Sequence, residues 1–129
     1  MTPELTALAL AVLLQVVQIG LYSHVARKQV GTRTALLPRD EPVVLTGLAG
    51  RAQRAMNNHF EGLLLFAIAV MLVTLSGKAS GFTAAMGWIY LAARALYVPA
   101  YLFGWVPWRS LVWTAGFFAT TAMVLAALL

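Results

Sequence analysis

Residues 43–76 read VVLTGLAGRAQRAMNNHFEGLLLFAIAVMLVTLS, a stretch without proline. At 1.5 Å per residue, a helix over this stretch would be about 51 Å long, well beyond a hydrocarbon core of about 30 Å. Its first half carries Arg51, Arg54 and Glu61, whereas residues 63–75 are almost wholly apolar. We therefore expect a helix over 43–76 whose N-terminal half projects from the membrane into the cytoplasmic interface.

The composition of the whole chain supports a membrane protein. Hydrophobic residues make up 61% of the sequence and charged residues 10%, and the mean hydropathy is +0.82. A soluble domain of this size needs far more charge on its surface. We predict an all-α integral membrane protein, a four-transmembrane-helix bundle that forms a single domain over 1–129. Its expected helices are 5–26, 43–76, 82–103 and 108–129.

The distribution of basic residues predicts the topology. No basic residue precedes the first apolar run, which argues for a retained first helix rather than a cleaved signal peptide. Short loops on one side of the bundle, and the start of the last helix, carry Arg27, Lys28, Arg33, Arg39 and Arg109, against Lys78 on the other side. Cytoplasmic loops are enriched in Lys and Arg, so both termini should face away from the cytoplasm. The net charge of +5 reflects this bias, and we predict no nucleic-acid partner.

Two polar stripes stand out on otherwise apolar helices. At about 100° per residue, the first stripe falls within an arc of about 80° and consists of Arg51, Arg54, Asn58 and Glu61. The second falls within about 60° and consists of Tyr90, Arg94, Tyr97 and Tyr101. Charges at bilayer depth cost roughly 2.5–3.5 kcal/mol each on insertion scales, so they are paired, hydrated or functional.

The two stripes together predict a basic pocket. Antiparallel neighbours would bring Glu61 and Arg94 to the same depth, and we expect an ion pair between them. Arg51, Arg54 and Arg109 would then be surplus cations, suited to a ligand whose carboxylates arginine grips bidentately. The structural alternative is that the charges lock helices together and that the tyrosines belong to an interfacial belt.

The sequence contains no motif for disulfide formation, metal binding, phosphate binding or nucleophilic catalysis. The chain has no cysteine, which excludes disulfides and thiolate ligands. His24 and His59 each lack a second ligand at metal-binding spacing, so we predict no metal site. No phosphate-binding loop, nucleophile elbow or carboxylate pair is present. Gln15, Gln18 and Tyr22 share one face of the first helix and should form hydrogen bonds between helices.

The stripes resemble a known family. The run RAQRAMNNHFE at 51–61 resembles the second-helix signature of the membrane-associated proteins in eicosanoid and glutathione metabolism (the MAPEG family). The run YLAARALYVPAY at 90–101 is similar to the third helix of that family. Arg109 and Ser110 resemble the arginine-serine pair that opens helix 4 in its prostaglandin E synthase branch. The likeness to bacterial-type members covers nearly the whole chain.

The resemblance implies a homotrimer in a bacterial inner membrane, with glutathione sites between subunits that open towards the cytoplasm. By position, Arg54, Asn58 and Glu61 would hold glutathione, Tyr97 and Tyr101 would line its site, and Arg94 would support it. Arg51 would stand behind these residues, and Arg27 occupies the place of a helix 1 arginine that grips a carboxylate. Arg109 would be catalytic, because its cation would stabilise the glutathione thiolate.

Three departures from the family bear on the substrate. Gly62 stands where the leukotriene synthase branch has a tyrosine, and Met56 where both eicosanoid-making branches have a polar residue. The turn before Arg109 is one residue shorter than in the prostaglandin branch. These differences favour a broader detoxifying activity over specific eicosanoid synthesis.

The basic pocket and the family resemblance together imply a membrane-bound, glutathione-dependent transferase or peroxidase acting on lipophilic electrophiles that arrive through the membrane lipid. The rival hypothesis is a non-catalytic transporter or scaffold whose intramembrane charges pair structurally. Four-helix exporters of similar length carry their essential acid in helix 1, and residues 5–24 contain no charged side chain.

Overall fold

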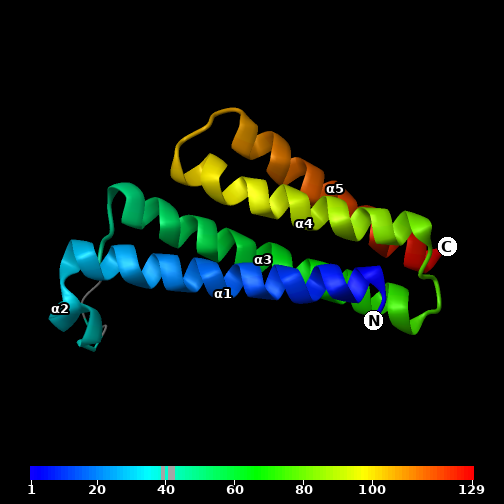
Figure 1. Ribbon diagram of the computed structural model, residues 1–129, viewed down its shortest axis with the longest axis horizontal. Helices are drawn as coiled ribbons and strands as arrows, with labels where there is room; N and C mark the ends of the chain where they lie inside the picture. The colour runs from blue at the N-terminus through cyan, green and yellow to red at the C-terminus, as the bar shows by residue number, and fades with distance from the viewer. Residues whose placement is uncertain (39, 41–42) are drawn as a thin grey trace.

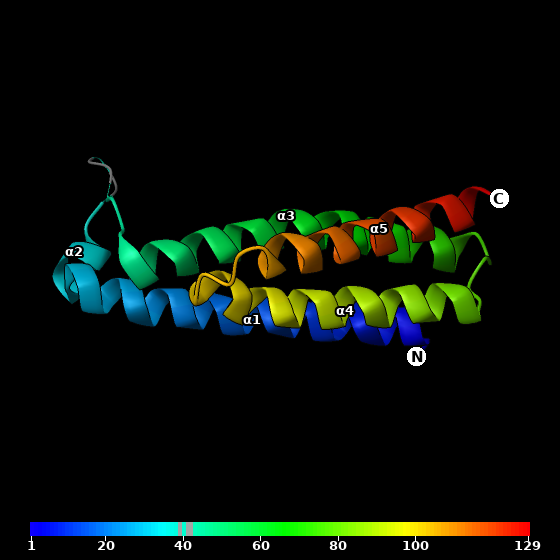
Figure 2. The same cartoon turned by 90° about the horizontal axis from the view of Figure 1, so that it is seen from above.

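The computed structural model describes residues 1–38, 40 and 43–129, and every regular element in these residues is a helix (Figure 1). The helices are α1 (Pro3–Val30), α2 (Thr32–Leu36), α3 (Gly47–Leu75), α4 (Gly81–Leu102) and α5 (Trp108–Leu128). Both termini and the turn at 76–80 lie at one end, called here the termini end. The short α2 and the turn at 103–107 lie at the other, the loop end (Figures 1 and 2). The all-helical prediction is confirmed.

Three of the helices have the length and composition of membrane spans. These are α1, α3 and α5. The fourth long helix, α4, runs beside them but carries Arg94 among three tyrosines, which lowers its hydropathy. A multi-helix membrane bundle is therefore supported by three candidate spans and one additional helix.

The first helix is longer than predicted at both ends. The Thr2 side chain accepts a hydrogen bond from the backbone N–H of Leu5 at 3.2 Å, and Pro3 occupies the first helical position, where proline is favoured. Glu4 is therefore part of α1. At the other end α1 continues to Val30 and stops at Gly31, whose φ of 85° suits a residue without a Cβ.

The connection to α3 differs from expectation. The sequence did not indicate α2, and α3 begins at Gly47 rather than at 43. Gln29 of α1 accepts from the backbone N–H of Thr46 at 2.9 Å and donates to its carbonyl at 2.8 Å. These bonds fix an extended residue directly before α3. The prediction of Arg39 as a loop cation lies outside the described residues.

The core of the bundle lies towards the termini end. Small residues on α1 allow α4 to approach closely: a Cβ added to Gly87 would lie 3.5 Å from that of Ala7. Ser80 and Thr83 form a capping box that begins α4. Towards the loop end, the α4–α5 pair diverges from the α1–α3 pair (Figure 1). A second, smaller cluster joins α1 to the start of α3 and consists of Ala26, Leu45 and Ala49. The larger cluster of buried core residues consists of Ala7, Ala11, Phe66, Ala69, Val70, Val73, Tyr90, Ala119 and Met123.

Candidate functional site

The two polar stripes meet near the loop end. Arg54 on α3 donates from Nε to the hydroxyl of Tyr101 on α4 at 3.0 Å. Arg109, in the first turn of α5, lies with its guanidinium carbon 5.1 Å from the centre of the same Tyr101 ring. Tyr101 therefore links cations from two other helices, and its ring contributes a cation–π contact to Arg109.

A second link lies deeper in the bundle. Arg94 on α4 donates from Nη2 to the side-chain oxygen of Asn58 on α3 at 2.9 Å. Its guanidinium carbon also lies 4.4 Å from the centre of the Tyr97 ring. Arg94 is 2% exposed, so its cation is held in the bundle by a neutral amide and an aromatic face.

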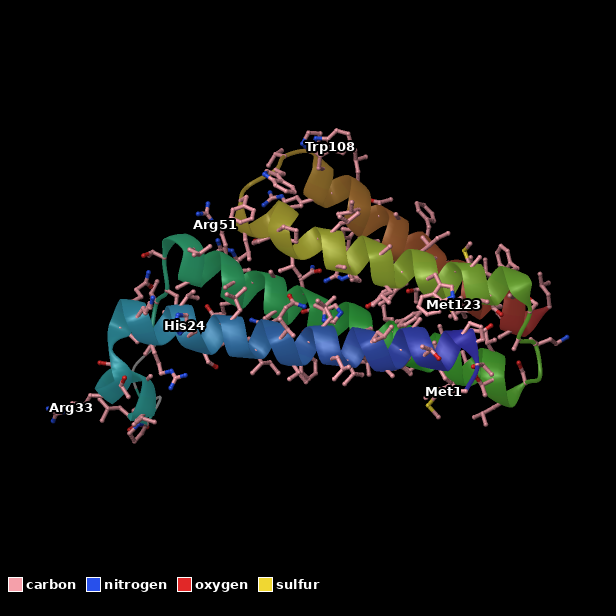
Figure 3. All side chains as sticks on the ribbon, in the orientation of Figure 1. Met1, His24, Arg33, Arg51, Trp108 and Met123 are labelled. Carbon is pink, nitrogen blue, oxygen red and sulfur yellow. The ribbon has the colours of Figure 1, made fainter. Side chains whose placement is uncertain are left out.

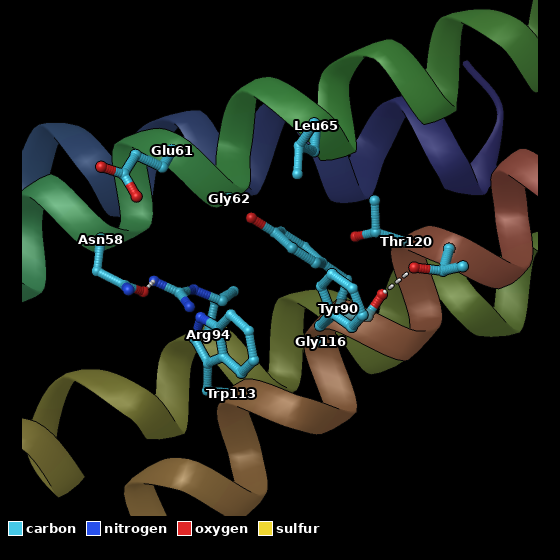
Figure 4. Close-up of a pocket in the computed structure, with 11 residues that line it drawn as sticks. Asn58, Glu61, Gly62, Leu65, Tyr90, Arg94, Trp113, Gly116 and Thr120 are labelled. Atoms are coloured by element: carbon cyan, nitrogen blue, oxygen red, sulfur yellow. Dashed lines mark hydrogen bonds between the residues drawn. The ribbon is translucent and has the colours of Figure 1, made fainter.

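The predicted ion pair between Glu61 and Arg94 is wrong. Figure 4 shows the Glu61 carboxylate lying apart from the Arg94 guanidinium, whose hydrogen bond runs to Asn58. On the helical wheel of α3, Glu61 lies about 60° further from the buried face than Asn58 does. Glu61 is therefore exposed, and Arg94 instead reaches the amide of Asn58, which lies about one helical turn before Glu61 on α3.

The helices enclose an open pocket at this level of about 440 Å³, within the size range of small-ligand sites. Three helices contribute to it. Its lining residues are Asn58, Tyr97, Tyr101, Arg109, Ser110, Trp113 and Thr114. Most of these side chains carry hydrogen-bonding groups, and Arg109 supplies a half-buried positive charge. Such a pocket can bind a polar, anionic ligand at the edge of an apolar bundle.

Five predicted site residues do not line this pocket. Arg54 and Arg94 contact its wall through Tyr101 and Asn58, and Glu61 lines a neighbouring cavity. The other two are Arg51 and Arg27. Arg51 lies at the loop end of α3 (Figure 3), and its buried Nε has no hydrogen-bond partner among the described residues. Arg27 is exposed on α1, where its Nε donates to the carbonyl of Ser23 on its own helix at 3.2 Å. Neither residue lines the pocket within one subunit.

The histidine on α3 joins two helices. His59 is fully buried, and its Nδ1 lies 2.7 Å from the side-chain oxygen of Gln15 on α1. Gln15 also donates to the carbonyl of Met56 at 3.3 Å. The predicted interhelical role of Gln15 is confirmed, whereas the amide atoms of Gln18 have no partner in the described part of the chain. No group of three or more potential metal-ligating side chains occurs in residues 1–38, 40 and 43–129.

Sequence reasoning missed part of the pocket wall. Trp113 and Thr114 follow Arg109 and Ser110 by four residues each, so the four side chains share one face of α5. The spacing was visible in the sequence. The apolar character of α5 concealed it, since Trp113 reads as one more hydrophobic residue of a span.

The comparisons with known proteins agree with the fold. The sequence profile of the MAPEG family matches residues 4–129, nearly the whole chain. Comparison with curated proteins finds no match. The family match and the three apolar helices identify a multi-pass integral membrane protein. The resemblance seen at 51–61 and 90–101 is thereby confirmed, and the chain belongs to the MAPEG family.

Proposed function

We propose that this protein binds glutathione in the pocket between α3, α4 and α5 and uses its thiolate against lipophilic electrophiles, as a transferase or a peroxidase. The observation that carries the proposal is the convergence of Arg54, Arg94 and Arg109 on Asn58 and two tyrosines at one end of a membrane bundle. Family membership supports a glutathione-related role in a membrane. In this arrangement α4 is the fourth span.

The pocket suits the chemistry of the thiol compound. Glutathione is an anionic tripeptide, and arginine guanidinium groups bind carboxylates with paired hydrogen bonds. Arg54, Asn58 and the exposed Glu61 would hold its backbone, with Tyr97 and Tyr101 along the wall. Arg94 would act through Asn58, which it holds by a 2.9 Å hydrogen bond.

In the proposed site, Arg109 would act on the glutathione sulfur. It lines the pocket, and its contact with the Tyr101 ring leaves its guanidinium N–H groups free to face a ligand. A cation beside the thiol lowers its pKa and raises the fraction of nucleophilic thiolate at neutral pH. The thiolate would then attack an electrophile that approaches between the helices from the lipid.

The proposal includes a homotrimer with sites between subunits. Arg27 is exposed on α1 and does not reach the pocket of its own subunit. A neighbouring subunit would bring its Arg27 to the pocket, and the site would then be complete only in the assembly. With both termini outside the cytoplasm, the loop end and the pocket would face the cytoplasm, where glutathione is present.

Calorimetry in detergent tests the binding. Wild-type protein should bind glutathione, and Arg54→Ala should bind it about tenfold more weakly, since a charge-assisted hydrogen bond contributes about 1.5–3 kcal/mol. Arg33→Ala, an exposed arginine on α2, is the matched control and should bind normally. Absence of binding heat with the wild-type protein would reject the proposal.

One observation favours the alternative of a transporter. Glu4, now part of α1, is 1% exposed, and its Oε1 accepts from the Thr83 hydroxyl at 2.6 Å. A buried acid in the first helix is what a coupled exporter would use. Glu4 lies at the termini end, away from the pocket, so Glu4→Gln should leave glutathione binding unchanged. Loss of binding in this variant would couple Glu4 to the pocket and favour the transporter.

A further inference from the structure

A second, smaller cavity lies next to the pocket that Arg109 lines, called here the arginine pocket, and shares Asn58 and Trp113 with it. Figure 4 shows side chains that line this cavity. Its volume is about 170 Å³, and a protein cavity of about 150 Å³ can hold benzene. Leu65 and Phe117 line it and are themselves exposed, so the cavity meets the side surface of the bundle between α3 and α5. An apolar molecule could therefore enter from the lipid.

Three polar atoms in the wall of this cavity need partners. They are the Tyr90 hydroxyl, the Arg94 Nε and the Thr120 Oγ1, and none has a hydrogen-bond partner among the described residues. The three residues are 2%, 2% and 7% exposed. An unpaired buried polar group costs about 1–3 kcal/mol. Tyr90 and Arg94 can both donate, so the missing partner is an acceptor.

The space beside these donors depends on a glycine. A Cβ added to Gly62 would lie 3.4 Å from the Tyr90 hydroxyl and 4.0 Å from the Arg94 guanidinium carbon. The Tyr90 ring is fixed by stacking on Phe66, with ring centres 3.8 Å apart. The hydroxyl is thus held towards a space that any larger residue at position 62 would occupy.

We propose that this cavity binds a small, mainly apolar molecule through one acceptor oxygen, such as a carbonyl attached to a single ring. Tyr90 and Arg94 donate to that oxygen, and Leu65, Trp113 and Phe117 surround the ring. A neutral carbonyl fits the site, because its oxygen can accept from both donors and the surrounding wall is mainly apolar. That such a molecule is the acceptor of the thiolate rests on the proposed function, whereas its binding does not.

The test uses acetophenone labelled with carbon-13 at the carbonyl and observed by NMR, with protein in detergent and protein-free micelles as reference. The wild-type protein should show a saturable downfield displacement of the carbonyl resonance, because hydrogen bonds withdraw electron density from that carbon. α-Methylstyrene, which has the same shape but no oxygen, should compete about tenfold more weakly than unlabelled acetophenone. Equal competition would overturn the role of the acceptor oxygen.

Two variants locate the binding. Tyr90→Phe should reduce the affinity for acetophenone about tenfold and diminish the displacement of its carbonyl resonance. Gly62→Ala should weaken binding by placing a methyl group beside the Tyr90 and Arg94 donors, at contact distances that the fold can accept. Tyr22→Phe and Gly20→Ala on α1 are the controls, and a Cβ at Gly20 has no atom within 4 Å. If both cavity variants bind as the controls do, the proposal fails.

A final arm separates this cavity from the arginine pocket. The acetophenone measurement contains no thiol, so a failure to bind acetophenone would not count against glutathione binding. A failure to bind glutathione would likewise not count against the acetophenone site. Saturating glutathione should not displace acetophenone if the cavity is a site of its own. Competitive displacement would assign the cavity to the glutathione site and overturn the inference.

Discussion

Arg94 donates a 2.9 Å hydrogen bond to Asn58 from a guanidinium that is 2% exposed, so a neutral amide on α3 is the polar partner that holds this cation. Asn58→Leu should remove that partner and lower stability by about 1–3 kcal/mol, because a buried charge loses its hydrogen bond. Thermal unfolding followed by size-exclusion chromatography measures the loss. Asn57→Leu is the control, since Asn57 is exposed on the same helix. Equal melting temperatures for the two variants would contradict this role of Asn58.

Replacing Arg109 should change the ionisation of the glutathione thiol more than the affinity for glutathione. Arg109→Ala is expected to bind glutathione within about threefold of the wild-type affinity, since the other polar groups remain, yet to form less thiolate at neutral pH. The ultraviolet absorbance of the thiolate reports this directly, with Arg33→Ala as the matched control. Normal thiolate formation in Arg109→Ala would reject the catalytic assignment while leaving the binding assignment intact.

The stability lost when Gln15 is replaced should be recovered when its buried partner His59 is replaced as well. Gln15→Leu leaves the His59 Nδ1 without its partner at 2.7 Å and should cost about 1–3 kcal/mol of stability. The double variant Gln15→Leu with His59→Phe should recover most of that loss, because replacing both polar partners with apolar groups can be nearly neutral. Thermal unfolding of the single and double variants provides the comparison. Additive losses would mean that the hydrogen bond does not couple the two side chains.

A site shared between subunits predicts complementation. Arg27→Ala and Arg54→Ala should each weaken glutathione binding when expressed alone. Co-expression should restore part of it, because some pockets in mixed trimers receive Arg54 from one subunit and Arg27 from its neighbour. Calorimetry on the co-purified mixture tests this, and simple mixing of the separately purified proteins is the control. Equally weak binding in the co-expressed sample would place Arg27 outside the site.

The helices and the meeting of the stripes could be predicted because they depend on local rules. Hydropathy and the 3.6-residue period identified the long helices to within a few residues, and the same period placed Arg54 and Tyr101 in the two polar stripes. Helix ends were less predictable. The late start of α3 follows two hydrogen bonds between Gln29 and Thr46, a contact across sequence that no local pattern contains.

The wrong prediction of an ion pair between Glu61 and Arg94 has a different origin. Charge complementarity favoured Glu61, but the rotation of α3 turns Glu61 outward and leaves Asn58 facing α4. The position of the buried face decides this rotation, and that face is defined by neighbours such as Gln15 on α1. The cavity beside Gly62 was equally hidden, because a glycine leaves no signal in a hydrophobic pattern. The partners of individual side chains could therefore be identified only from the packed structure of the bundle.

The four long helices differ in length. At 1.5 Å per residue, α1 and α3 measure about 42 and 44 Å, whereas α4 and α5 measure about 33 and 32 Å. The shorter pair barely exceeds a hydrocarbon thickness of about 30 Å, so if α4 and α5 both span the membrane, as proposed, the turn with Trp105 would lie at the headgroups. In a thicker bilayer this turn would sink below them, and Arg109 would lose its route to water. The length of the lipid acyl chains would then control how readily the thiol compound reaches Arg109, without any change in the protein.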